Sequence, residues 1–71
     1  MNMSAETIRW LMADSVKPDD SETVLINLSD DEDEPVWLGW WDSSENQWRD
    51  VLGTLIRGGV AYWAPMPRGP V

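Results

Sequence analysis

Six tryptophans in 71 residues, without phenylalanine, histidine or cysteine, constrain this chain more than any other feature. A domain of this length buries only about 60% of the surface that its unfolded chain exposes, so its stability depends on a few large side chains. Each buried tryptophan removes roughly 150–250 Å² from water, and without cysteine no disulfide staples the fold. The sequence therefore predicts a single small domain, residues 1–71, with Trp40 and Trp63 as core anchors.

The missing residue types also exclude most active sites. Without histidine and cysteine there is no Ser-His-Asp triad, no thiol nucleophile and no ordinary structural zinc site. No two carboxylates stand out as a glycosidase-like pair. We therefore expect a protein that is not an enzyme, with no catalytic residues, no metal site and no cofactor.

The chain is strongly acidic, with a net charge of −8 from 13 acidic and five basic residues. This charge repels nucleic acid and anionic membranes, so we expect neither as a partner. It either keeps a small aromatic-rich protein soluble or complements a basic patch on another protein. The first ten residues lack the apolar core of a signal peptide, and no apolar run is long enough to span a bilayer. We expect a soluble, cytoplasmic protein.

Alternating apolar residues predict a mainly β fold, an antiparallel meander of about four short strands. The strands are expected at residues 23–28, 36–42, 47–52 and 60–64. Residues 1–9 are either flexible or part of a short helix capped by Ser4, which would make the fold α+β; an extended segment beginning near Ile8 is the alternative. Residues 65–71 contain three prolines and should form an extended tail.

The strand expected at 36–42 is apolar on both faces. Trp37, Gly39 and Trp41 point to one side, and the apolar residues between them point to the other. Because a sheet with one solvated face needs only one apolar face, the second must serve a purpose. Either the N-terminal segment or the tail covers it, or it is the interface of a homo-oligomer, or it binds a ligand. Trp37 and Trp41 are therefore candidate binding residues for a peptide or a carbohydrate.

Five consecutive acidic residues connect the first two expected strands. They repel one another and should remain in water. The run lacks the turn glycine and the distant bidentate glutamate of an EF-hand loop, so it is not read as a calcium site. It is either a solvated connection or a surface that meets a basic patch on a partner protein. The candidate partner-binding residues here are Asp30, Asp31, Glu32, Asp33 and Glu34.

A pattern of aromatic residues and prolines extends over residues 10–67. It consists of Trp10-Leu11, Pro18, Thr23-Val24-Leu25-Ile26, Gly39-Trp40-Trp41-Asp42, Trp48 and the ending Tyr62-Trp63-Ala64-Pro65-Met66-Pro67. This pattern resembles the small phage and prophage family called domain of unknown function five-five-one, whose members end in His-Trp-Met-Pro-Leu-Pro. Tyr62 stands here where the family usually has histidine, so no role that needs that imidazole is expected.

The resemblance implies an accessory protein encoded by a phage or prophage, and it supplies no established activity. Combined with the charge, it predicts a non-enzymatic protein of the host cytoplasm. Such a protein would bind a host or phage protein with a basic patch through its acidic surface. Two alternatives stay open: an aromatic module that binds a peptide or carbohydrate, and a homo-oligomeric structural protein.

Overall fold

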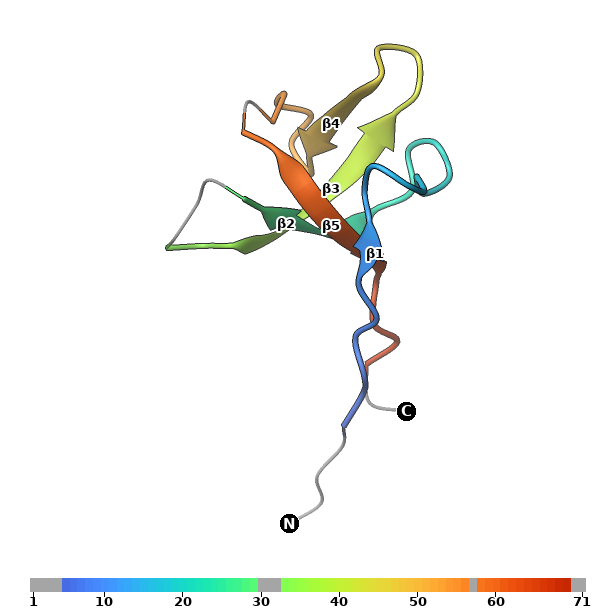
Figure 1. Ribbon diagram of the computed structural model, residues 1–71, viewed down its shortest axis with the longest axis vertical. Helices are drawn as coiled ribbons and strands as arrows, with labels where there is room; N and C mark the ends of the chain where they lie inside the picture. Colours follow the sequence, from blue (N-terminus) through green and yellow to red (C-terminus); the bar gives the residue numbers. More distant parts are fainter. Residues whose placement is uncertain (1–4, 30–32, 57, 70–71) are drawn as a thin grey trace.

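The computed structural model describes residues 5–29, 33–56 and 58–69, which contain one five-stranded antiparallel sheet (Figure 1). No helix occurs in these ranges, so the fold is all-β and the helical alternative for the N-terminal residues is wrong from residue 5 onward. The strands are β1 (Leu11–Met12), β2 (Val24–Leu28), β3 (Val36–Asp42), β4 (Gln47–Asp50) and β5 (Val60–Pro65).

The order of the strands across the sheet is β1-β5-β2-β3-β4. The expected meander is therefore correct for β2 to β4, but β5 returns to pair with β2 instead of extending the sheet beyond β4. The outer edge of β4 is already occupied by the chain that follows it. Arg49 forms a bridge with Leu55, and the Ile56 amide donates to the Trp48 carbonyl at 3.0 Å. Because that edge is filled, β5 pairs with the open edge of β2.

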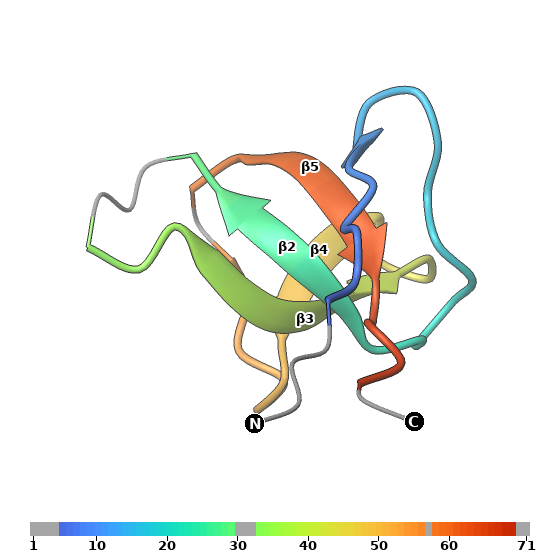
Figure 2. The same cartoon turned by 90° about the horizontal axis from the view of Figure 1, so that it is seen from below.

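The core lies on one face of the sheet and is centred on β2. Val24 and Ile26 are fully buried, and Trp63 of β5 lies directly opposite Ile26 with only 6% of its surface exposed. The Trp63 indole N–H donates to the Val16 carbonyl at 2.8 Å, which satisfies its one buried polar group. The sheet is so twisted that β4 passes across the β2–β5 pair (Figure 2), and Trp48 packs against this core. Trp63 is thus confirmed as a core anchor.

Trp40 is not a core anchor. Its neighbour Gly39 faces the core, since a Cβ built at Gly39 would meet the Ile26 side chain at 2.8 Å. Successive residues of a strand point to opposite faces, so Trp40 lies on the outer face, where it pairs with Arg49 and is only partly buried. The face of β3 on which Trp40 lies is therefore the outer face of the sheet, not the core face.

The fourth strand is shorter than expected, ending at Asp50 instead of Leu52. The Asp50 carboxylate accepts hydrogen bonds from the backbone amides of Leu52 and Thr54 at 2.9 and 3.0 Å, and Gly53 takes a positive φ of 87°. This turn leaves Leu52 87% exposed. The Asp50 side chain therefore ends the strand, a local competition that apolar alternation does not reveal.

The C-terminal residues 66–69 belong to no strand and lie beside the N-terminal segment (Figure 1). The Glu6 carboxylate accepts hydrogen bonds from the backbone amides of Arg68 and Gly69 at 2.7 and 3.0 Å. The tail is therefore held by the N-terminal segment through Glu6.

We expect Gly39→Ala to lower the free energy of unfolding by about 1–3 kcal/mol, the usual cost of overpacking a core. The added Cβ would approach the backbone carbonyl oxygen of Arg49 to 2.6 Å, and a backbone atom cannot turn aside. Urea denaturation followed by circular dichroism measures the loss. Gly59→Ala is the control, because its Cβ would meet only the hydroxyl of Ser29. An equal loss in both variants would show that the Gly39 contact is not limiting.

Candidate functional site

The acidic candidates lie in the connection between β2 and β3. Asp33 and Glu34 are exposed, whereas the other three candidates of the acidic run, Asp30, Asp31 and Glu32, lie outside the described residues. The Pro35 carbonyl accepts hydrogen bonds from the Leu28 amide at 2.7 Å and from the Asn27 side chain at 3.3 Å. These bonds attach the end of the connection to β2. Glu34 precedes Pro35 and therefore lies just before the start of β3.

The two tryptophan candidates do not form one platform. Trp41 packs edge-to-face on Trp48, with ring centroids 5.3 Å apart, and the Lys17 ammonium lies 5.0 Å from the Trp41 ring centroid. Trp37 is 45% exposed and pairs with Ile26 toward the other end of β3. Four residues along a strand separate their backbones by about 13 Å. Trp41 is therefore occupied by contacts within the chain, and Trp37 alone remains accessible.

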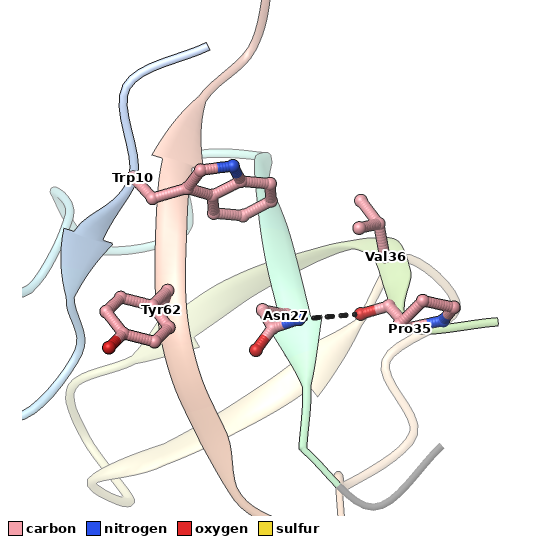
Figure 3. A pocket seen from close by; sticks show the side chains of 5 residues that line it. All are labelled: Trp10, Asn27, Pro35, Val36 and Tyr62. Carbon is pink, nitrogen blue, oxygen red and sulfur yellow. Dashed lines mark hydrogen bonds between the residues drawn. The ribbon is translucent and has the colours of Figure 1, made fainter. Parts of the chain in front are cut away.

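A groove that the sequence did not indicate lies on the outer face of the sheet. Tyr62, Asn27 and Val36 form a row across β5, β2 and β3, because Asn27 is the register partner of both others. Figure 3 shows Tyr62 at one end of this row and Pro35 and Val36 at the other, with the Trp10 ring extending over β5 toward β2. These five residues line a hollow of about 470 Å³, which we call the sheet-face groove.

The sheet-face groove is mostly apolar and open to solvent. Trp10, Val36 and Tyr62 are 38%, 42% and 45% exposed. A smaller hollow of about 170 Å³ adjoins it through Val36 and is lined as well by Leu25, Leu38 and Trp37. Trp37 also lines this smaller hollow, although as the register partner of Ile26 its side chain belongs to the opposite face of the sheet from Val36 and Tyr62.

Sequence reasoning missed Trp10 and Tyr62 as site residues. One signal was present: if Trp63 is buried, strand alternation sends its neighbour Tyr62 to the opposite face. Nothing in the sequence pattern indicated that β1 would pair with β5, with Met12 opposite Tyr62, and so bring Trp10 to the same groove.

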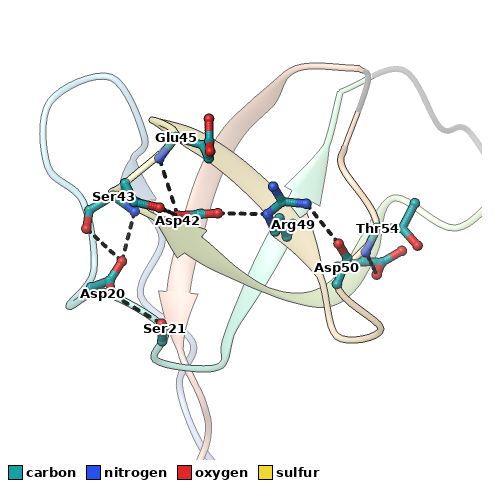
Figure 4. Close-up of polar contacts among 10 residues, drawn as sticks. Asp20, Ser21, Asp42, Ser43, Glu45, Arg49, Asp50 and Thr54 are labelled. Carbon is teal, nitrogen blue, oxygen red and sulfur yellow. Dashed lines mark hydrogen bonds and ion pairs between the residues drawn. The ribbon is translucent and has the colours of Figure 1, made fainter.

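A separate group of carboxylates holds the loops at the other end of the sheet (Figure 4). Asp42 accepts hydrogen bonds from the Ser44 hydroxyl at 2.6 Å and from the Arg49 Nε at 2.8 Å. These bonds, the Ser44 one first, hold the pKa of Asp42 below its ordinary value of 3.8. The amide and hydroxyl of Ser43 donate to Asp20 at 2.8 and 2.7 Å and lower the pKa of that carboxyl too.

The bonds of Asp20 and Asp42 join the loop before β2, the turn after β3 and the strand β4. Both carboxylates accept hydrogen bonds from donors of the chain itself, so this cluster stabilises the fold. Among the described residues, no three acidic side chains are grouped so as to hold a metal ion. Nor does this part of the chain contain a helix long and apolar enough to cross a membrane.

Comparisons of this chain with protein-family models, with curated proteins and with solved structures give no match. The sheet-face groove therefore has to be interpreted from its own chemistry.

The lowered pKa values of Asp20 and Asp42 predict acid sensitivity. A carboxyl whose folded pKa lies below its unfolded pKa stabilises the fold above the unfolded value, and this contribution is lost as the pH falls through the folded pKa. We expect Asp42→Asn to lower Tm at neutral pH, and the difference from the parent protein to shrink as the pH falls below 3.8. Thermal unfolding at a series of pH values measures both effects.

The control is Asp14→Asn, which changes an exposed carboxylate outside this cluster. Its Tm should follow that of the parent protein at every pH. If Asp42→Asn stayed equally destabilised down to strongly acid pH, the ionised form of Asp42 would not be the source of the stability.

Proposed function

We propose that this protein is a non-enzymatic binding module that engages a partner protein through the sheet-face groove. The observation that carries the proposal is the exposure of Trp10 and Tyr62 together in one apolar hollow of a very small domain. Aromatic side chains are enriched at the centres of protein interfaces, and contiguous exposed apolar surface in a soluble protein commonly marks a binding site.

The charge of the chain indicates what kind of partner is favoured. Asp33 and Glu34 immediately precede Pro35, which lines one end of the sheet-face groove. The whole chain carries a net charge of −8. A partner with basic residues beside an apolar segment would be attracted by this field and would match the groove at contact. This partner would meet the acidic surface predicted from the sequence, and its aromatic contacts would be Trp10 and Tyr62 instead of the predicted Trp37 and Trp41.

The resemblance to a phage and prophage family adds a biological setting. It favours an accessory protein in the cytoplasm of a host cell, with a host or phage protein as the partner. This setting stays a prediction, and the binding experiment below does not depend on it.

Selection from a random peptide library displayed on phage tests the proposal. We expect the enriched peptides to combine lysine or arginine with apolar residues, and synthetic copies to bind more weakly as salt rises from about 0.1 to 1 M, because the Debye length falls from about 10 to 3 Å. Tyr62→Ala should weaken their binding by about five- to thirtyfold, as expected for a central aromatic contact. Isothermal titration calorimetry measures these affinities.

Leu52→Ala is the matched control, because Leu52 is 87% exposed and lies outside the sheet-face groove. Its affinities should equal those of the parent protein. The proposal fails if no peptide is enriched, or if the enriched peptides bind Tyr62→Ala as tightly as the parent protein.

A further inference from the structure

We infer that Glu6 is a positioning residue for the sheet-face groove. By joining the N-terminal segment, residues 5–10, to the tail, residues 66–69, it holds Trp10 in place as one wall of the groove. This inference rests on the proposed function and adds a residue outside the groove that controls its shape. It follows from the register of the two segments, from the prolines opposite the N-terminal segment and from the position of Trp10 between two attachment points.

The N-terminal segment and the tail continue the antiparallel register of β1 and β5. In that pair Leu11 lies opposite Trp63. Counting outward from this pair by equal steps along both chains brings Glu6 opposite Arg68. The Glu6 carboxylate accepts hydrogen bonds from the amides of Arg68 and Gly69 at 2.7 and 3.0 Å, which we call the Glu6 contact. The two segments therefore lie side by side beyond the end of β1 (Figure 1).

Two prolines prevent the backbone from continuing the β1–β5 ladder in this direction. The Ala13 amide donates to the Ala61 carbonyl at 3.0 Å, so Ala61 is a position at which this chain bonds to the N-terminal side. Such positions recur at every second residue of an antiparallel ladder, which places Pro65 and Pro67 at two of them. Proline has no N–H to donate. The Glu6 side chain therefore supplies a contact that the backbone of these two residues cannot.

Trp10 lies between the two points at which the N-terminal segment is attached. On one side β1 begins at the next residue, and on the other side is the Glu6 contact. In the same register Trp10 falls opposite Ala64, which is fully buried although it follows the core residue Trp63 and so belongs to the outer face. Figure 3 shows the Trp10 ring extending over β5 toward β2. An indole in this position accounts for the burial of Ala64 on a face that is otherwise partly open to solvent.

Attachment at both ends restricts the backbone that carries Trp10. Without the Glu6 contact, residues 5–10 would lose their attachment to the tail and keep that to β1. A segment attached at one end has more conformational freedom to lose when a ligand orders it, and this loss lowers affinity. The Glu6 contact therefore orders the Trp10 wall of the groove before a ligand arrives.

A double-mutant cycle on affinity tests the inference. The probe is a peptide from the library selection that binds the parent protein and is weakened by Tyr62→Ala. We expect Glu6→Ala to weaken its binding about two- to tenfold, because part of the binding surface must then be ordered on binding. In a Trp10→Ala background the same change should have no further effect, because Glu6 acts through Trp10. Glu22→Ala removes an exposed carboxylate elsewhere and should bind like the parent protein.

A second measurement needs no ligand. Each tryptophan gives one indole N–H signal in a proton–nitrogen NMR spectrum, and Trp10→Phe identifies that of Trp10. We expect Glu6→Ala to move the Trp10 signal toward the position of free tryptophan. The Trp63 signal should stay in place, because that indole donates to the Val16 carbonyl in the core. Equal movement of both signals would show that Glu6 supports the whole fold and would overturn its assignment to Trp10.

The outcomes separate this inference from the function on which it rests. If the Trp10 signal is unchanged in Glu6→Ala, or if this change weakens the peptide equally with and without Trp10, the inference is overturned and the proposed function stands. If no selected peptide depends on Tyr62, the proposed function fails, and the NMR comparison still decides whether Glu6 positions Trp10.

Discussion

The burial of Trp63 against Ile26 is the contact on which the rest of the structure depends. Trp63 has Ile26 of β2 on one side and Leu11 of β1 on the other as register partners. This one side chain therefore joins the N-terminal strand, the C-terminal strand and the centre of the sheet. Since strand residues alternate between faces, burying Trp63 also sends Tyr62 to the outer face. The core contact and the groove are two consequences of the same pairing.

The strand β3 is apolar on both faces, and the structure gives each face different surroundings. On the inner face, Gly39 leaves the space that the Ile26 side chain fills. On the outer face, Leu38 and Val36 line open hollows. The inner aromatic residue Trp41 is covered by Lys17 and Trp48, not by the tail, which Glu6 holds elsewhere. One face thus packs the core, and the other is partly open to solvent.

The acidic residues divide into two groups with different physical tasks. Asp20, Asp42 and Asp50 accept hydrogen bonds from residues of turns and loops and so hold these segments in place. Asp33 and Glu34 are exposed beside the sheet-face groove. The carboxylates of the first group hold the fold together, and their negative charge accompanies that role. The second places that charge where a ligand would meet it, which is why the proposed partner is basic.

The sequence by itself determined the strands β2 and β3, the approximate positions of β4 and β5, and the burial of Trp63, because alternation and the scarcity of large side chains are local properties. It did not determine that β5 pairs with β2, that Trp40 faces outward, or that Trp10 and Tyr62 share a groove with Asn27. Those facts depend on which sheet edge is open, and the edge of β4 is closed by residues 54–56 of its own chain. Strand pairing between distant segments is decided by such competition, and only the tertiary structure records its outcome.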